Sequence, residues 1–374
     1  MRILVPTYPQ DIHARTVALA LESRGHEVCL WYGSDYPTSQ SASIGIEDGI
    51  LSWQVEGAGL SLDSDLFDVV WYRRPVGPVL PKAAMHPGDY VIAQRECSLF
   101  HRSFWHLLAP GAFWVNPLQS QERARAKPVQ LVEAVRAGLS VPPTLCSNDP
   151  GQIRAFLQKY PGETVFKGFA PAQWTREDGI SFLYTTAVEE GDLPDDDILR
   201  LSPGIFQRKI EKDHELRVTF VGRHAVTAKL LSQDSDASRL DWRAALGGVP
   251  VVPAELPDAV YRACLKVMDR LDIVFACFDF IVTPEGEHVF LELNEMGQFL
   301  WVELENPEIK VLDPFCELLA QARPDFDWSP GRARLAFADW QERALELNGN
   351  ETPLHVPKPN YHEVQDALDP AARQ

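Results

Sequence analysis

The sequence has few cysteines, and their spacing forms no paired motif. The six cysteines, at positions 29, 97, 146, 264, 277 and 316, contain no CxxC pair. This scatter argues against a disulfide framework or a cysteine zinc site, and it predicts reduced thiols in a cytoplasmic protein. No apolar run approaches the ~20 residues of a membrane-spanning helix. Because Met1 leads directly into a predicted strand, we also expect no signal peptide.

Basic residues are in the minority. The chain has 35 Lys and Arg against 53 Asp and Glu, so its formal net charge is −18. A surface of this charge does not favour nucleic acid, whereas a basic peptide or another cationic partner is compatible with it. The length of 374 residues and the hydrophobic content of 45% allow two or three globular domains.

Several motifs that carry chemistry in other enzymes are also missing. The first predicted strand is not followed by GxGxxG, and the segment from Gly168 to Gly191 contains no glycine-rich phosphate loop. We find no Ser-His-Asp or Cys-His nucleophile signature, so we expect the scattered histidines to be structural or exposed. Internal repeats and low-complexity tracts are absent.

The stretch from Val274 to Trp301 has the pattern of a strand hairpin. The run Val274–Val282 is rich in Val, Ile and Phe, and the run from His288 to Leu293 has the same character. Between them, Thr283–Gly286 has the Pro and Gly that favour a turn. Polar residues interrupt both apolar runs, which suggests a site rather than a plain core hairpin.

Asp279, Glu292 and Asn294 are those polar residues. Because side chains alternate along a strand, Glu292 and Asn294 point to one face, and Asp279 can lie opposite them on the neighbouring strand. Two buried carboxylates repel each other unless a cation joins them, and oxygen ligands of this kind suit magnesium. The alternative is that Glu292 and Asn294 simply end an exposed strand.

The first segments of the chain predict a parallel sheet. A strand, a helix and a strand follow one another at residues 2–6, 12–23 and 27–31. A further strand, at residues 66–75, ends in Arg73 and Arg74. Two adjacent arginines at a strand end can bind an anion or form a solvated rim, and the sequence alone does not decide between these.

Eight residues together suggest a polyphosphate and magnesium. Four of them are cations, three are metal-type ligands, and Gln207 lies in a strand where it could meet a base edge: Lys127, Lys167, Arg217, Arg243, Asp279, Glu292, Asn294 and Gln207. The purely structural alternative requires each of them to be an unrelated surface residue.

With these residues the chain resembles the ATP-grasp ligases, and most of all the microviridin-type branch that cross-links ribosomal peptides, the graspetides. The resemblance covers about Met1 to Ala322. Its most specific run is Phe278-Asp279-Phe280 with Phe290-Leu291-Glu292-Leu293-Asn294 and Gly297-Gln298-Phe299-Leu300-Trp301-Val302-Glu303. Further matches are Val70-Trp71-Tyr72-Arg73-Arg74-Pro75, Ala126-Lys127, Phe206-Gln207, Glu215-Leu216-Arg217 and Leu240-Asp241-Trp242-Arg243.

The resemblance implies ATP as the nucleotide, with Mg2+. It places Lys127 and Lys167 at the phosphates, Gln207 and the backbone near Ile210 at adenine, and Glu215 at the ribose. It also implies that Asp279, Glu292 and Asn294 bind magnesium, and that Arg217 and Arg243 neutralise the γ-phosphate during transfer.

The fold implied by the resemblance is α/β with an ATP-grasp core. We expect a pre-ATP-grasp domain with a parallel sheet at residues 1–117 and a central lid subdomain at residues 118–203. A C-terminal subdomain with a mixed sheet and the ATP and magnesium site is expected at residues 204–323, followed by an extension at residues 324–374. We also expect a cytoplasmic homodimer.

The implied activity is ligation through an acyl phosphate, in which a carboxylate is phosphorylated and an amine or hydroxyl then attacks it. The expected substrate is a precursor peptide with side-chain carboxylates; the alternatives are small-molecule substrates or a catalytically silent binding protein. The family's usual Asn-Pro-Asn-Gly-Gln is replaced here by Asn294-Glu295-Met296-Gly297-Gln298. Glu295 could accept a proton from an amine acceptor, or it could simply face solvent. The tail beyond Pro324 has no match in the branch.

Overall fold

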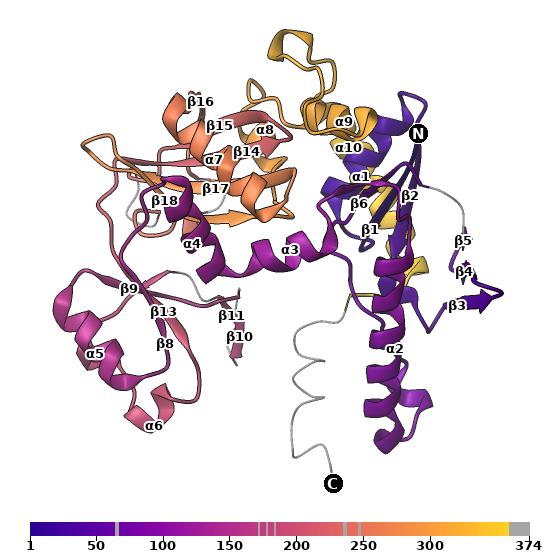
Figure 1. The fold of residues 1–374 in the computed structure, drawn as a ribbon, viewed down its shortest axis with the longest axis horizontal. Coiled ribbons are helices and arrows are strands. Elements are labelled where there is room, and N and C mark those ends of the chain that lie inside the picture. Colours follow the sequence, from indigo (N-terminus) through magenta and orange to yellow (C-terminus); the bar gives the residue numbers. More distant parts are fainter. Residues whose placement is uncertain are drawn as a thin grey trace. The chain divides into compact units, whose positions relative to one another are not determined.

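The computed structural model describes residues 1–63, 67–170, 173–176, 179–182, 185–234, 238–245 and 248–358. Parts of the predicted segment 168–191 and the end of the predicted extension lie outside these residues. The chain divides into two compact units (Figure 1). Unit 1 contains residues Met1–Gln121, Val221–Arg223 and Lys310–Gln374, and unit 2 contains Glu122–Phe220 and His224–Ile309. The finer boundaries expected from the sequence stay predictions.

Unit 1 is built on a parallel sheet, as the strand-helix-strand opening predicts. The strand order is β2-β1-β6-β7, and every neighbouring pair is parallel. The strands are β1 (Arg2–Thr7), β2 (Glu27–Tyr32), β6 (Val69–Trp71) and β7 (Phe113–Val115). They consist almost entirely of apolar residues because both faces are covered. Leu4 and Val70 join a core with Phe104 of α2 (Pro87–Leu107), whereas Trp71 contacts Phe315 of α9 (Leu312–Gln321).

Helix α1 (Ile12–Glu22) links the first two strands. It begins at Asp11, whose side chain accepts hydrogen bonds from the backbone N–H groups of His13 and Ala14. Helices α9 and α10 (Ala338–Glu351) pack against it. The sequence has a helical pattern over residues 332–347, but the helix in this region begins only at Ala338. Unit 1 also contains a three-stranded antiparallel sheet for which the sequence offered no prediction: β3 (Gln40–Glu47), β4 (Ile50–Gly57) and β5 (Leu60–Leu62).

Arg73 has a different role from both of those considered from the sequence. It is 1% exposed, and its Nε donates to Asp11 Oδ2 at 3.1 Å. Thr7 donates to the same oxygen at 2.9 Å. Burial alone would raise the pKa of Asp11, but Arg73 outweighs burial and the pKa lies below its ordinary value. Arg73 is thus an internal ion-pair partner, and neither anion binding nor a solvated rim explains it.

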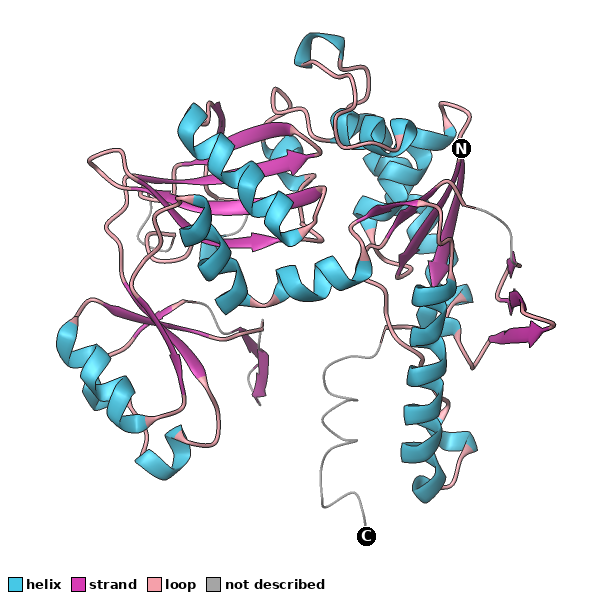
Figure 2. Ribbon diagram, in the orientation of Figure 1, coloured by secondary structure: helices cyan, strands magenta, loops and turns pink. Residues whose placement is uncertain are grey.

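Unit 2 contains the larger antiparallel sheet, drawn with the other strands in magenta in Figure 2. It has five strands in the order β16-β15-β14-β17-β18. Its strands are β14 (His214–Val221), β15 (His224–Leu230), β16 (Val251–Ala254), β17 (Phe275–Val282) and β18 (His288–Asn294). Helices α4 (Lys127–Ala137) and α7 (Asp258–Leu271) pack against each other and share its apolar core. The C-cap of α4 is Gly138, which has φ 95°, a conformation that favours glycine at a helix end.

The second sheet of unit 2 is smaller and antiparallel. Its order is β12-β9-β13-β8, from the strands β8 (Thr144–Ser147), β9 (Thr164–Lys167), β12 (Thr186–Ala187) and β13 (Gly204–Arg208). Phe166 and Phe206 pair across two strands and pack toward Ile153 of α5 (Pro150–Lys159) and Leu199 of α6 (Asp196–Leu199). By alternation, Lys167 and Gln207 lie on the opposite face.

The remaining elements of unit 2 are short. They are α3 (Leu118–Arg125), which begins in unit 1, the hairpin β10 (Gln173–Arg176) and β11 (Gly179–Phe182), and α8 (Trp301–Glu305). All six cysteines carry free thiols. Within the described part of the chain, no helix combines the length and apolar character needed to cross a membrane.

Candidate active site

The hairpin of β17 and β18 brings together the residues predicted to bind a metal. Asp279 pairs directly with Glu292 across the two strands. The next pair is Phe280 with Phe290, so Leu291 is an extra residue on β18 and forms a bulge. In a regular strand, Phe290 and Glu292 would point to the same face, because they are two residues apart. The bulge between them changes this, so the fully buried Phe290 faces the core and Glu292 faces the site. The sequence did not reveal this shift of register.

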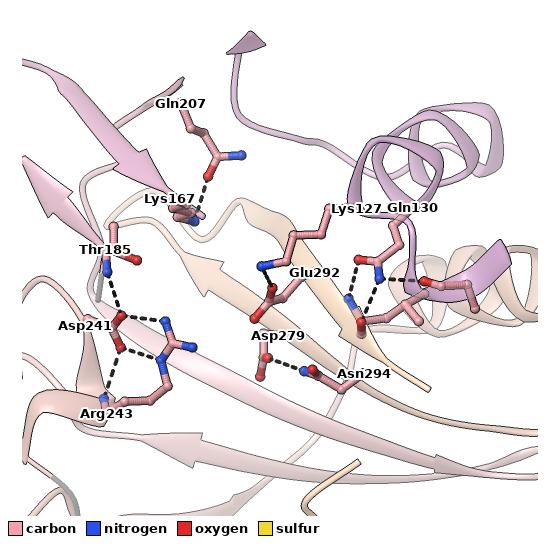
Figure 3. A network of polar contacts seen from close by, with 12 residues as sticks. Lys127, Gln130, Lys167, Thr185, Gln207, Asp241, Arg243, Asp279, Glu292 and Asn294 are labelled. Carbon is pink, nitrogen blue, oxygen red and sulfur yellow. Dashed lines mark hydrogen bonds and ion pairs between the residues drawn. The ribbon is translucent and has the colours of Figure 1, made fainter. Parts of the chain in front are cut away.

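Asp279 is held by Arg217 and Asn294. Arg217 Nη1 donates to the two carboxylate oxygens of Asp279 at 2.9 and 2.8 Å, and Arg217 Nη2 donates to the Gln298 carbonyl at 2.9 Å. Asn294 Nδ2 donates to Asp279 Oδ2 at 3.2 Å (Figure 3). Burial raises the pKa of Asp279 and the charge of Glu292 adds to this, although Arg217 opposes both. Such a pair of carboxylates favours a nearby cation.

Glu292 is paired with Lys127. The distance from Lys127 Nζ to Glu292 Oε2 is 2.8 Å (Figure 3). Burial raises the pKa of Glu292, but Lys127, followed by Lys167 and Arg243, outweighs burial, and the pKa lies below its ordinary value. Glu292 is therefore ionised at neutral pH and available to a cation.

Lys167 and Gln207 lie together on the face of the small sheet opposite Phe166 and Phe206. Lys167 Nζ donates to Gln207 Oε1 at 2.8 Å, and Gln207 Nε2 donates to Thr144 Oγ1 at 2.9 Å. Burial lowers the pKa of Lys167 to about 8, and the positive charges of Lys127 and Arg243 contribute. An anionic ligand would reverse this shift, as expected for a residue that binds phosphate.

Arg243 is oriented by Asp241, a residue that the sequence did not place in the site. Arg243 Nε and Nη2 donate to the two Asp241 oxygens at 2.8 and 2.6 Å, a two-point contact (Figure 3). The Thr185 backbone N–H donates to Asp241 at 3.2 Å. Burial opposes ionisation of Asp241, but these bonds lower its pKa to about 2. The Asp-x-Arg spacing could have signalled this pairing.

The adenine and ribose candidates are less connected. Ile210 is half-buried just after β13. Glu215 is buried and bound by Lys212 Nζ at 2.6 Å, and Lys212 also donates to the Leu240 carbonyl at 3.2 Å. Sequence reasoning missed Lys212 as a partner of Glu215, although the spacing of three residues was visible.

Gln130 is a further residue that the sequence did not single out for the site. It is 3% exposed, and its side chain bonds both the N–H (3.0 Å) and the carbonyl (2.9 Å) of Leu293, the residue between Glu292 and Asn294. Its Nε2 also donates to the Ala124 carbonyl at 2.6 Å. Because β18 is an edge strand, its outward backbone groups need such partners. Gln130 thereby fixes the backbone that carries two metal candidates.

Glu295 does not face solvent. It is 8% exposed, and Arg125 Nε donates to its carboxylate at 3.1 Å. The solvent-exposed alternative is therefore wrong. Its carboxylate is occupied by the Arg125 guanidinium, so the structure offers no support for Glu295 as a base.

The site fits magnesium by the chemistry of its donors. Within the described residues, no group of three or more His, Cys, Asp or Glu side chains could hold a metal ion. The candidate set instead consists of two opposed carboxylates and the amide oxygen of Asn294, which are hard oxygen donors. Four cations and three carboxylates interact electrostatically here: Lys127, Lys167, Arg217, Arg243, Asp241, Asp279 and Glu292. This local excess of positive charge, in a chain of −18, suits an anion that carries a metal.

The comparisons with known proteins point to one family. Residues 2–122 match the MvdD pre-ATP grasp domain. The chain is similar to a RiPP-associated ATP-grasp ligase of Chryseobacterium gregarium, solved with ADP and a leader and core peptide. The TM-score is 0.77 at 27% identity, and 88% of this chain and 99% of that chain are covered. The chain has the ATP-grasp fold and is similar in structure to ligases of the microviridin-type branch.

Two more structures of this branch are similar to the chain. The macrocyclase MdnC of Microcystis aeruginosa MRC, bound with precursor peptide MdnA, has a TM-score of 0.75 at 26% identity, and 86% of this chain and 100% of that chain are covered. The macrocyclase MdnB of the same organism has a TM-score of 0.71 at 28% identity, with coverages of 85% and 98%. No curated protein sequence matches the chain. The expected ATP-grasp fold is thus confirmed, while the roles of individual residues stay predictions.

Proposed function

We propose that this ATP-grasp protein is an ATP-dependent ligase that cross-links side chains of a ribosomally made precursor peptide through an acyl phosphate. The observation that supports this most is the pairing of Asp279 with Glu292 in the field of four cations. The similar structures from this branch include complexes with a precursor peptide, or with ADP and peptide.

In the first step a peptide carboxylate oxygen attacks the γ-phosphorus of ATP, and ADP leaves with the electrons of the broken P–O bond. Arg217 and Arg243 face the charge that builds on the transferring phosphoryl group, and Lys127 and Lys167 bind the phosphates. Asp279, Glu292 and Asn294 would hold magnesium, which supplies charge neutralisation at the phosphate oxygens. In the second step an amine or hydroxyl attacks the acyl carbon, phosphate leaves, and the attacking group loses its proton.

The lid part of unit 2 offers a place to bind peptide away from the chemistry. A cavity of about 610 Å³ lies between the small sheet and α5 and α6, with Phe166, Phe206, Ile153 and Leu199 in its wall. Lys167 and Gln207 lie on the other face of that sheet. We propose that an apolar segment of the precursor binds in this cavity, because remote binding energy helps to position the reacting groups.

The bond type is a finer question. The net charge of −18 favours an amine acceptor such as Lys, so we propose an amide product, now without a role for Glu295. Mild base treatment of the product followed by mass spectrometry tests this, because esters hydrolyse and amides survive. The homodimer remains a prediction that light scattering can check.

The decisive test of the proposed function is ADP release measured with ATP, magnesium and candidate precursor peptides that contain Asp or Glu together with Thr, Ser or Lys. We expect ADP release coupled to the loss of one water per linkage in the mass of the peptide. ADP release with amino acids, and none with peptides, would instead support the small-molecule ligase.

A further inference from the structure

Two tryptophans next to the charged residues of the site are stacked on each other. The rings of Trp242 and Trp301 have centroids 4.8 Å apart and an angle of 23° between their planes. Both side chains are half-buried. Stacked aromatic rings attract each other beyond the effect of burying their area. We call this pair the Trp242–Trp301 stack.

One side of the stack is joined to Arg243. Trp242 lies between Asp241 and Arg243 in the chain, and Asp241 orients the Arg243 guanidinium by the two-point contact described above. All three belong to the connection from Leu231 to Pro250, between β15 and β16. This connection is longer than the roughly 12–15 residues that loops in compact domains normally reach. Within it, the short helical turn Trp242–Ala245 contacts α8 through the Trp242–Trp301 stack.

The other side of the stack is joined to Arg217. Trp301 Nε1 donates to the Gln298 carbonyl at 3.1 Å, and Arg217 Nη2 donates to the same carbonyl at 2.9 Å. Arg217 in turn binds both oxygens of Asp279. A continuous series of contacts thus leads from the metal candidates through Arg217 and Trp301 to Trp242 and Arg243.

We propose that the Trp242–Trp301 stack is a positioning pair, which holds Arg243 at a defined place opposite Arg217 so that both can meet the γ-phosphate. This rests on the proposed function, which assigns the two arginines to the transferring phosphoryl group. Without the stack, Arg243 would keep its contact with Asp241, but the loop that carries both residues would lose its aromatic contact with α8. The guanidinium would then reach the γ-phosphate in only part of the population.

Because Trp242 precedes Arg243 in the chain and Trp301 shares the Gln298 carbonyl with Arg217, the apolar surface of the stack would lie beside the acyl phosphate in this arrangement. An acyl phosphate that meets water hydrolyses, and the ATP is consumed without a product. Excluding water from such a site prevents this side reaction. The two indoles therefore have two roles in the proposed reaction: they position Arg243 and they exclude water.

The test compares the affinities for AMPPNP and for ADP, each with magnesium, by calorimetry on the full chain. AMPPNP has a γ-phosphoryl group and ADP lacks one. We expect Trp242→Ala to weaken AMPPNP about tenfold, which corresponds to ~1.4 kcal/mol, and to change ADP affinity less than about twofold. A purely structural role of the stack would weaken both nucleotides alike, and that result would overturn the proposal.

Three further variants sharpen the test. Trp242→Phe keeps a stacked ring and should restore AMPPNP affinity to within about threefold of the parent. Trp301→Ala should match Trp242→Ala, and the double variant should be no worse than either single variant, because the pair acts as a unit. Additive losses would show two independent residues and contradict the proposal. Tyr160→Ala is the matched control, since it removes one ring of the Phe156–Tyr160 pair in the lid, outside this series of contacts.

A peptide assay separates this proposal from the proposed function. If the parent modifies no peptide, the proposed function fails, while the nucleotide comparison still decides whether the stack places Arg243. If the parent does modify a peptide, Trp242→Ala should release more ADP per linkage formed than the parent does. An unchanged ratio of ADP to product would refute the role in excluding water.

Discussion

At the scale of single residues, Glu292 carries most of the proposed chemistry. It lies opposite Asp279 in the strand register and is bound by Lys127 at 2.8 Å. Its pKa is held below the ordinary value because three cations outweigh burial. Glu292 is ionised and lies opposite a second carboxylate, so a substitution there tests the magnesium assignment directly.

We expect Glu292→Gln to lower ADP release at least about a hundredfold, because one of the two metal carboxylates loses its charge. The fold should persist, since the Gln side chain can still accept a hydrogen bond from Lys127. Steady-state ADP release and thermal unfolding measure the two effects. Turnover at the parent rate would show that Glu292 does not bind the metal.

Lys167 leads to a prediction about pH. Its pKa of about 8 in the free protein reflects burial together with Lys127 and Arg243, partly offset by Glu292 and Asp241. Bound phosphates favour the protonated form, so the contribution of Lys167 to ATP affinity is complete below pH 8 and is lost as pH rises through and above 8. Calorimetry across this range should show the loss in the parent. In Lys167→Arg the loss of ATP affinity around pH 8 should be absent, because arginine stays protonated. The titration of ATP itself remains in both proteins.

At the scale of elements, the edge strand β18 depends on α4. Gln130 satisfies both backbone groups of Leu293, and the Ser140 carbonyl accepts from the Phe290 N–H at 2.8 Å. The bulge at Leu291 lies between these two supports. The strand that presents Glu292 and Asn294 is therefore fixed on both sides of its irregularity.

We expect Gln130→Met to destabilise the protein by on the order of 2–3 kcal/mol, because buried donors and acceptors on Leu293 and Ala124 lose their partner. Magnesium-dependent ADP binding should weaken as well. Urea unfolding and calorimetry provide the measurements. Val132→Ala, at an exposed position of the same helix, is the control and should alter neither quantity. Unchanged ADP affinity in Gln130→Met would show that the metal candidates do not depend on this support.

The lid cavity leads to a second prediction at this scale. Ile198 lines the cavity and is 55% exposed, so a charge there is tolerated by the fold. Ile198→Asp should raise the KM for a precursor peptide several-fold by making the apolar wall polar, and should leave ADP affinity unchanged. Steady-state kinetics measure the first and calorimetry the second. A KM equal to that of the parent would remove the cavity from the peptide-binding surface.

At the scale of the whole molecule, the C-terminal segment belongs to unit 1 rather than forming a separate body. Asp313 is 3% exposed and accepts hydrogen bonds from Trp328 Nε1 (2.7 Å) and from the backbone N–H groups of Arg334 (2.8 Å) and Leu335 (2.9 Å). Farther along, the buried Asp35 accepts from the Val356 N–H at 2.7 Å. Two buried carboxylates of unit 1, those of Asp35 and Asp313, thus bind the segment between Trp328 and Val356.

We expect Asp313→Ala to reduce the free energy of unfolding by about 3 kcal/mol, because three donors lose a charged acceptor. ADP affinity should stay the same, since every candidate site residue lies in unit 2. Trp328→Phe removes one of the three bonds and should cost a fraction of this. Thermal unfolding measures the loss of stability and calorimetry the ADP affinity. A parallel loss of ADP affinity would contradict the assignment of the nucleotide site to residues of unit 2 alone.

Local patterns in the sequence were sufficient for many features of this protein. The parallel opening of unit 1, the end of α4 at Gly138 and the β17–β18 hairpin follow from periodicity and turn chemistry. The side chains of Glu292 and Asn294 share a face because a strand alternates every two residues. Such features depend only on neighbours in the chain, and the backbone geometry determines them.

The tertiary structure alone decided which distant residues meet. Arg73 binds Asp11, Arg125 binds Glu295 across 170 positions, and Gln130 reaches the backbone of Leu293. The bulge at Leu291 also depends on the partner strand, because only pairing reveals an extra residue. These contacts are made between elements far apart in the sequence, where no local periodicity specifies the partner. A charged residue at a strand end therefore has the same local pattern whether it binds a ligand, faces water or pairs inside the protein, and burial by the assembled fold decides between them.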